Sequence, residues 1–339
     1  MSESVTIEVP ARLHLGFLDI PGSAPEPGRE RFGSIGLPIT GISTQLKISL
    51  GSSDQVEGDE SDRISRHLSA VRHHLGLNAR HRIIVQRTIP QHVGLGSGTQ
   101  LALAVAAGIR VLHNLPLDPV NDAGLLGRGM RSGIGIAAFR SGGLIIDAGK
   151  SPARAAPTIV ARLPFPEDWR AILVSDATTQ GIHGEDEIEA FKTLPPFPAA
   201  AAASISRHVL MGVMPGVVER DITLFGHAIH AIQTEIGNYF APAQGGVFTS
   251  RQVEAAMGRL SQAGAVGVGQ SSWGPTGFAF AASESEAERI VNACREATAG
   301  VNIEIVAGKN SGAHILRPAA SDNCEVPTEN IFIRQEQIS

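Results

Sequence analysis

The stretch Pro90-Gln-His-Val-Gly-Leu-Gly-Ser-Gly-Thr-Gln100 lies between two runs of different character. Residues Arg82–Ile89 precede it and predict a strand, whereas the alanine-rich run Leu101–Leu112 follows it and predicts a helix. A strand that enters a glycine turn and then a helix leaves free backbone N–H groups at the helix N-terminus, where the helix dipole also favours an anion. A glycine turn that only connects strand to helix is the alternative. The phosphate-binding residues that we predict are Gly94, Leu95, Gly96, Ser97, Gly98 and Thr99.

The composition limits the class of protein. The chain has 339 residues, 42% of them hydrophobic, which suffices for a large core in two domains or one intimate pair. The net charge of −5 gives no reason to expect nucleic-acid binding, and 12 phenylalanines with one tyrosine supply few base-stacking platforms. The N-terminus lacks the basic and apolar regions of a signal peptide, and no apolar run reaches the length of a membrane span. We therefore expect a cytoplasmic protein that acts on small molecules and binds neither nucleic acid nor membrane.

Strand-like and helical runs follow one another in a mixed order, which predicts an α+β protein. The chain opens with two strand-like runs, Val5–Leu15 and Thr44–Leu50. The Pro/Ala-rich stretch Ser151–Pro157 is the predicted linker. It divides the chain into a first domain of residues 1–157 and a second of residues 158–339.

Three further segments carry polar or charged side chains among small residues. In Ala11–Asp19, strand alternation places Arg12 and His14 on one face, although a solvated edge strand would look the same. Gly127–Gly143 holds arginines that suit a helix start receiving an anion, unless they only point into solvent. Gly269–Gly277 is a polar turn between two strands and a candidate second anion nest, with a plain hairpin turn as the alternative.

Together these segments resemble the GHMP superfamily, named for small-molecule kinases acting on galactose, homoserine, mevalonate and phosphomevalonate. The loop Pro90–Gln100 resembles its Pro-x-x-x-Gly-Leu-Gly-Ser-Ser phosphate loop, Arg12–Asp19 its N-terminal motif, and Gly269–Phe278 its C-terminal glycine motif. The three motifs occur in the superfamily's order and span nearly the whole chain. The resemblance implies an N-terminal domain like domain 2 of ribosomal protein S5 and a ferredoxin-like C-terminal domain.

Two departures from the kinase pattern bear on the reaction. Gly98 stands where the kinases have a second loop serine that helps to hold magnesium. Gly135 stands where they often carry an aspartate that acts on the substrate hydroxyl, and glycine can neither accept a proton nor orient an alcohol. The phosphate loop is present while the machinery for phosphoryl transfer is not.

A non-kinase branch of the superfamily fits this combination. The chain resembles the β-ribofuranosylaminobenzene 5′-phosphate synthases of methanopterin biosynthesis in the segments Arg31–Leu37, Arg128–Gly135, Gly181–Glu185 and Ser271–Thr276. The resemblance implies a pentosyltransferase that condenses p-aminobenzoate with phosphoribosyl pyrophosphate and releases CO₂ and pyrophosphate. Two alternatives remain: an ATP-dependent small-molecule kinase with a base from elsewhere, and a non-catalytic protein that binds a phosphorylated metabolite.

The predicted reaction assigns roles to individual residues. The glycine loop would hold one phosphate group and Arg128 and Arg131 another. The aromatic acid and the sugar would contact the predicted substrate-binding residues, which are Arg12, Ser271, Ser272, Trp273, Lys309, His183 and Glu185. Magnesium is expected to accompany the pyrophosphate; we predict no metal site built by the protein, no organic cofactor, and a homodimer.

Four residues are predicted to be catalytic: His14, Asp19, Arg31 and Asp176. Arg31 ends a polar loop interpreted as a mobile substrate segment. Asp176 lies in Val174–Gly181, which is similar to the acidic, threonine-rich loop of phosphoribosyltransferases. An ordinary strand-end turn closed by an Asx or ST motif is the alternative for this segment.

Overall fold

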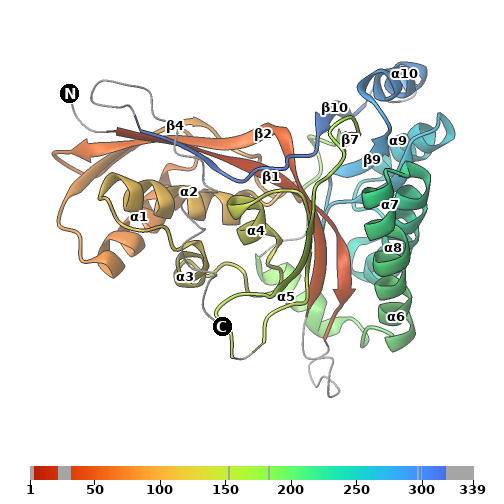
Figure 1. Cartoon of the computed structure of the whole chain (residues 1–339), viewed down its shortest axis with the longest axis horizontal. Helices are drawn as coiled ribbons and strands as arrows, with labels where there is room; N and C mark the ends of the chain where they lie inside the picture. The colour runs from red at the N-terminus through yellow and green to blue at the C-terminus, as the bar shows by residue number, and fades with distance from the viewer. Residues whose placement is uncertain are drawn as a thin grey trace.

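The computed structural model describes residues 4–21, 32–151, 153–181, 184–295, 298 and 300–317. Two antiparallel strands, β1 (Ser4–Asp19) and β2 (Gly33–Gly51), run through the first half of the molecule and bend before they end (Figure 1). Both are longer than predicted, because register shifts such as that between His14 and Gly16 let the paired strands bend without separating. The beginning of β1 and the end of β2 cover α1 to α4, whereas the end of β1 and the beginning of β2 face α8.

The first sheet has seven strands among the described residues. Its main order is β11-β1-β2-β4-β3, with β5 paired to the beginning of β2 and β6 paired to β5. The remaining strands are β3 (Gln55–Glu57), β4 (Arg80–Arg87), β5 (Leu144–Asp147), β6 (Ile159–Leu163) and β11 (His314–Leu316). The domain boundary at residue 157 stays a prediction, and two strands beyond it, β6 and β11, hydrogen-bond to this sheet.

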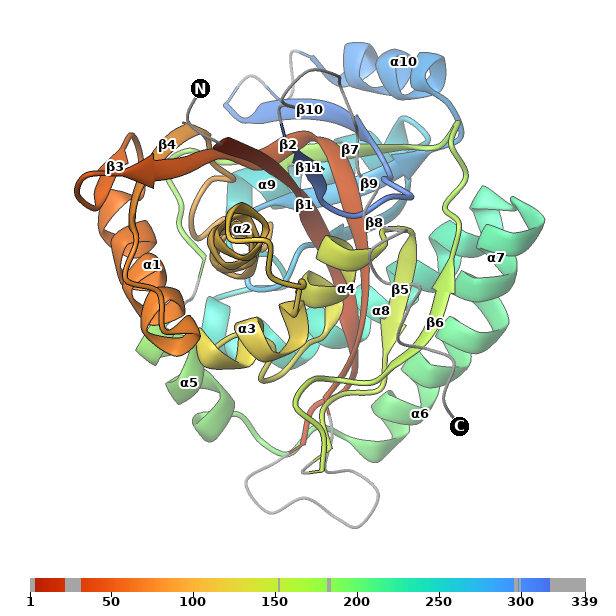
Figure 2. The ribbon, with the colours of Figure 1, turned by 60° about the vertical axis from the view of Figure 1, so that its left-hand side comes forward.

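Helices α1 (Ser61–Leu75), α2 (Ser97–Leu112), α3 (Pro119–Leu125) and α4 (Ile134–Arg140) cover one face of this sheet (Figure 2). Helix α2 is apolar on nearly every side and lies directly beneath β1 and β2. Its one buried charge, Arg110, forms a two-point ion pair with Asp122 of α3, with nitrogen–oxygen distances of 2.7 Å. Pairing of both charges satisfies this buried arginine and connects the two helices.

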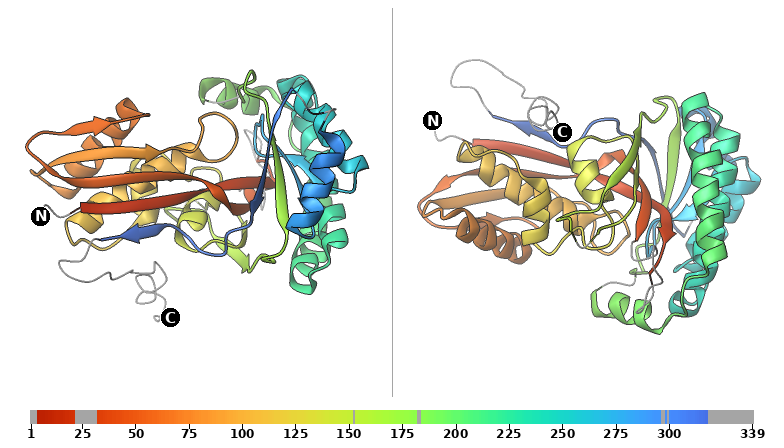
Figure 3. Two further views of the ribbon diagram at one scale, coloured as in Figure 1. Left: turned by 90° about the horizontal axis from the view of Figure 1, so that it is seen from above. Right: turned by 60° about the horizontal axis from the view of Figure 1, so that its bottom comes forward.

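The second sheet has the order β10-β7-β9-β8 and is antiparallel throughout. Its strands are β7 (Arg170–Ser175), β8 (Val266–Gln270), β9 (Gly277–Ala281) and β10 (Asn302–Ala307). With α9 (Arg251–Gln262) between β7 and β8 and α10 (Glu284–Cys294) between β9 and β10, this is the ferredoxin-like arrangement that the resemblance implies. The two views of Figure 3 show α9 and α10 on the outside of this sheet.

The segment between β7 and α9 adds four α-helices and a π-helical turn. These are α5 (Gly184–Thr193), α6 (Ala199–His208), η1 (Val209–Val213), α7 (Met214–Glu219) and α8 (Ile222–Gln244). Among the described residues, Ala199–Glu219 is the one helical stretch long and apolar enough to span a membrane by length and composition. This stretch packs against α8, and the core helix of a soluble protein passes the same test.

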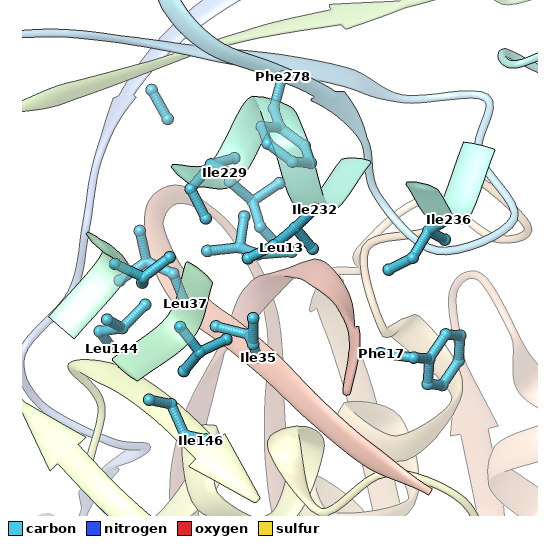
Figure 4. Close-up of a cluster of buried hydrophobic side chains, with 14 of the residues drawn as sticks. Leu13, Phe17, Ile35, Leu37, Leu144, Ile146, Ile229, Ile232, Ile236 and Phe278 are labelled. Atoms are coloured by element: carbon cyan, nitrogen blue, oxygen red, sulfur yellow. The ribbon is translucent and has the colours of Figure 1, made fainter. Parts of the chain in front are cut away.

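A continuous apolar core joins the two sheets. Figure 4 shows Leu13 and Leu37 of the bent strands in one cluster with Ile229 and Ile232 of α8 and Phe278 of β9. All five side chains are buried. The end of β1 and the beginning of β2 are therefore fixed against α8, which holds the N-terminal motif on β1 next to the loops of the second sheet.

Candidate active site

The glycine loop has the predicted arrangement: β4 enters it at Arg87, and α2 leaves it at Ser97. Gly94 and Gly96 have φ values of 84° and 83°, in the left-handed region that side chains disfavour. A Cβ on Gly94 would also collide with the backbone carbonyl of Ser271. These two positions need glycine to turn the chain and to bring the loop against the Ser271 turn.

The N-terminal motif on β1 holds the loop in place. The backbone N–H of Arg12 donates to Leu95 O at 3.1 Å, and its guanidinium donates to Gly94 O at 2.6 Å. Ser271, which is fully buried, donates to the same Gly94 oxygen at 2.8 Å and accepts from the backbone N–H of His14 at 3.0 Å. The hydroxyl of Ser271 is therefore used to join strand, loop and turn.

A cavity of about 500 Å³ opens beside the first turn of α2. Arginines from three different elements line it together with the loop. Burial lowers the pKa of Arg12 to about 10, and the nearby Glu187 opposes that shift. The lining residues are Arg12, Arg63, Gln91, His92, Gly94, Gly96, Ser97, Gly98, Thr99, Arg128, Gly184, Glu187, Ser272, Trp273 and Gly274.

Gly135, at the position of the kinase aspartate, packs directly against α2. A Cβ there would lie 2.8 Å from Cγ2 of Thr99, and the Gly135 carbonyl accepts a hydrogen bond of 2.9 Å from the Gln100 side chain. A side chain at this position would require Thr99 to shift. Gly135 thus offers no acidic group, and the packing leaves little room for one.

One wall of the cavity is aromatic. The Trp273 ring is only 4% exposed and lies 4.2 Å from Phe240 and 5.5 Å from Phe191, measured between ring centroids. Its indole Nε1 has no hydrogen-bond partner among the described residues. Arg131 does not line the cavity; its guanidinium lies 4.6 Å from the centre of the Phe191 ring and 2.6 Å from a Glu187 oxygen.

A buried aspartate, Asp147, is marked by no sequence motif and holds the Arg128–Gly135 segment by a hydrogen bond. Asp147, at the end of β5, accepts hydrogen bonds from the backbone N–H groups of Gly133 at 3.0 Å and Gly149 at 2.8 Å and from the Ser34 hydroxyl. Burial raises the pKa of Asp147 to about 6. The only sequence signal for it is a lone acid after the apolar run Leu144–Ile146.

Comparison with known proteins assigns the chain to a family. The model of the GHMP kinases N terminal domain matches residues 62–143, and that of the GHMP kinases C terminal domain matches residues 213–299. A β-ribofuranosylphenol 5′-phosphate synthase of Methanothermobacter thermautotrophicus is 30% identical over 335 residues, covering 92% of this chain and 98% of the relative. The chain belongs to the β-ribofuranosylphenol 5′-phosphate synthase family, a branch of the GHMP kinase superfamily.

A second member of this synthase family, from Archaeoglobus fulgidus, is 32% identical and covers 91% of this chain and 98% of its own. The homoserine kinase of Cytophaga hutchinsonii is 17% identical, with a TM-score of 0.69 over 93% of this chain and 98% of its own. The mevalonate diphosphate decarboxylase of Staphylococcus aureus is 16% identical, with a TM-score of 0.67 over 93% of this chain and 98% of its own. The predicted GHMP kinase fold is confirmed.

The predicted site residues of this synthase family member fall into two groups. Most phosphate-loop residues, with Arg12, Arg128, Ser272 and Trp273, line the cavity. His14 lies just behind it, its ring 4.5 Å from Phe17 between centroids. Burial and the charge of Arg12 lower the pKa of His14 to about 3, so its ring is neutral at physiological pH, and its Nε2 has no hydrogen-bond partner in the part of the chain that the structure describes.

The other predicted residues lie elsewhere or outside the described chain. Asp19 lies at the end of β1, where it accepts from the N–H of Ile20, and it does not line the cavity. Lys309 also lies away from the cavity; burial lowers its pKa, and Glu8 opposes this shift. Arg31 and His183 are outside the described residues, as is the side chain of Glu185.

Asp176 lines a different cavity of about 200 Å³, on the side of the loop that carries Pro90, Val93 and Leu95. Its carboxylate accepts from the N–H and hydroxyl of Thr178, at 2.8 and 2.6 Å, and from Thr179, at 2.8 Å. Ser250, the N-cap of α9, also donates to it at 2.7 Å. These hydrogen bonds are those of the Asx or ST turn, which is the alternative interpretation of Val174–Gly181.

Proposed function

We propose that this protein condenses a para-substituted benzoate with phosphoribosyl pyrophosphate, forming a C-riboside 5′-phosphate and releasing CO₂ and pyrophosphate. The arginine-lined cavity at the N-terminus of α2 supports this proposal, because it offers cations and free N–H groups to a phosphorylated ligand. Gly135 supports it further, since it supplies no acid of the kind that a kinase would use and packs closely against Thr99. The printed name of the relatives indicates a ribosyl phosphate product of the same kind.

The residues that line the cavity suit the proposed condensation. The bond from ribose C1 to pyrophosphate breaks and leaves an oxocarbenium-like carbon, while negative charge builds on the leaving group, where Arg12 and Arg128 can stabilise it. The ring carbon that bears the carboxylate then bonds to C1. The electron pair of the carbon–carboxylate bond restores the aromatic ring as CO₂ departs. No proton has to be removed from the ring, so the absence of a base at Gly135 is no obstacle.

The aromatic wall is the proposed place for the benzoate ring. Trp273 is an apolar surface at the edge of an otherwise basic cavity, and Phe191 packs against it from outside the cavity. A less polar setting favours loss of CO₂, because the carboxylate charge disappears in the reaction. Separate regions for the diphosphate and for the ring are what a condensation of these two substrates requires.

The para substituent of the benzoate is open to experiment. The sequence predicts p-aminobenzoate, whereas the relatives' printed name is that of a phenol, which the same reaction would form from 4-hydroxybenzoate. Both groups push electrons into the ring, and both would activate the carbon para to them. The two acids should therefore be assayed side by side.

Magnesium is proposed to arrive with the diphosphate. Among the described residues no three His, Cys, Asp or Glu side chains gather as a metal site. The loop hydroxyls of Ser97 and Thr99 and the Glu187 carboxylate are the oxygen ligands that the cavity offers. These oxygen ligands fit a magnesium ion that keeps phosphate and water as its other ligands. The ion would further stabilise the negative charge of the leaving pyrophosphate.

One assay tests the proposal. Purified protein, phosphoribosyl pyrophosphate and magnesium are incubated with either acid labelled in its carboxyl group, and CO₂ and pyrophosphate are measured; a parallel reaction omits magnesium. Equal amounts of the two products are expected. Release of neither product from either acid would refute the synthase, ATP-dependent phosphorylation of an alcohol would establish a kinase, and binding without turnover would favour a metabolite sensor.

The homodimer and the cytoplasmic location remain proposals, to be checked by light scattering and by cell fractionation.

A further inference from the structure

We propose that Arg63, on the first turn of α1, is a third arginine ligand of the diphosphate, together with Arg12 and Arg128. This assignment rests on the proposed function for the identity of the ligand. No motif in the sequence marks Arg63, which is one of several arginines on an amphipathic helix. In the structure its side chain is 20% exposed and lines the cavity beside the phosphate loop.

The geometry around Gly98 carries the proposal. A Cβ on Gly98 would lie 3.1 Å from Nη1 of Arg128 and 3.2 Å from Nη2 of Arg63. Two guanidinium groups from different elements thus converge on the first turn of α2. Glycine at this position lets both cations approach the free N–H groups of the helix end, where a phosphate group would bind.

Arg63 is held in this orientation by its own partner. Its Nη1 donates to Glu60 at 2.8 Å, which leaves Nη2 to face Gly98. The other oxygen of Glu60 accepts from Gln91, a residue at the start of the glycine loop that also lines the cavity. A guanidinium with one edge fixed and the other directed at a helix N-terminus is prepared for a multivalent anion.

The charges of the site are not balanced by protein groups alone. Burial lowers the pKa of Arg128, and the charges of Arg63 and Arg66 lower it further. The pKa of His67 is lowered to about 4, first by burial and then by Arg128, Arg63 and Arg66. Close positive charges repel one another, so a diphosphate that binds among them stabilises the arrangement.

A pair of variants on one helix tests the assignment. Arg63→Gln removes the proposed ligand, while Arg66→Gln removes an exposed charge one turn along that does not line the cavity. Binding of inorganic pyrophosphate and of phosphoribosyl pyrophosphate is measured by calorimetry. We expect Arg63→Gln to raise both dissociation constants by about 10- to 100-fold, and Arg66→Gln to change them by less than about threefold. The KM for the aromatic acid should not change in either variant.

Three outcomes would overturn the assignment: no pyrophosphate binding by the wild type, equal affinity in Arg63→Gln, or equal losses in both variants. Arg63→Lys provides a second check, because it keeps the charge and loses the planar fork; it should recover only part of the affinity. Thermal unfolding of each variant verifies that it is folded. If pyrophosphate binding depends on Arg63 but neither acid is decarboxylated, the proposed reaction fails while the assignment of Arg63 stands.

Discussion

Two polar clusters lie on opposite sides of the glycine loop, and they differ in how their charges are satisfied. The arginine cluster of Arg12, Arg63 and Arg128 surrounds a cavity of about 500 Å³ with few carboxylates to balance it. The Asp176 cluster, formed with Thr178, Thr179 and Ser250, has each carboxylate oxygen occupied by protein donors. Buried polar groups with complete hydrogen bonding stabilise a fold, whereas converging like charges need a ligand. The first cluster is therefore the better candidate for chemistry.

The largest expected effect comes from blocking the loop on the side of the arginine cluster. Gly96→Val puts a branched side chain at a φ of 83°, about 3.0 Å from the Arg12 guanidinium. We expect kcat/KM for phosphoribosyl pyrophosphate to fall by at least about 100-fold, because the loop and Arg12 can no longer approach the phosphate together.

Gly76→Val is the matched control for that variant. Gly76 ends α1 with a φ of 63° and has nothing within 4 Å of a Cβ. Its substitution carries the same kind of backbone strain, about 1–2 kcal/mol of stability, without touching the cavity. Comparable losses of activity in two folded variants would show that strain alone explains the result, and that the loop's position in the site does not matter.

A smaller effect, and of a different kind, is expected from the Asp176 cluster. Asp176→Asn should lower the free energy of unfolding by about 1–3 kcal/mol while kcat/KM stays within about threefold of wild type. The hydrogen bonds from Thr178 and Ser250 hold the pKa of this carboxyl well below its usual range. A lowered native pKa stabilises the protein above the ordinary aspartate pKa of about 4, and this contribution is lost as the pH falls below that value.

Denaturant unfolding at pH 7 and at lower pH therefore separates the two roles of Asp176. Wild type should lose stability on acidification more steeply than Asp176→Asn does. A variant that keeps its stability and this steep acid dependence, yet loses tenfold or more in kcat/KM, would restore the catalytic role that the sequence predicted.

Local sequence signals predicted what is local in this fold. The strand, glycine loop and α2 follow from residues that are neighbours in the chain. The end of β1 and the beginning of β2 did not, because glycines such as Gly16 and Gly36 and the register shifts weaken their alternation. A helix start was predicted within Gly127–Gly143, where α4 lies, but its support by Asp147 and Gln100 was not, because these residues are distant in sequence.

The site residues likewise divide into those that local sequence could predict and those that it could not. The loop and Arg128 could be predicted, because the chemistry of their neighbours in the chain already indicates a phosphate. The role of Arg63 could not be predicted, because it depends on the packing of α1 against α2. That packing directs one guanidinium nitrogen of Arg63 to Glu60 and the other towards Gly98. Asp176 shows the reverse problem: an acid followed by threonines is typical both of a ribose-phosphate loop and of a capped turn, and only the three-dimensional partners separate the two.

The smallest expected effect concerns the aromatic wall of the arginine-lined cavity. Trp273→Phe keeps an aromatic ring against Phe240 and removes the indole N–H, which has no partner among the residues that the structure describes. If that N–H donates to the benzoate, KM for the acid should rise by about 2- to 12-fold, with little change in the affinity for pyrophosphate. Trp169→Phe, a change in the core beside Phe165, is the control and should affect thermal stability alone. A lower melting temperature for Trp273→Phe with an unchanged KM would make Trp273 a core residue like Trp169, and the acid would then have to bind away from this wall.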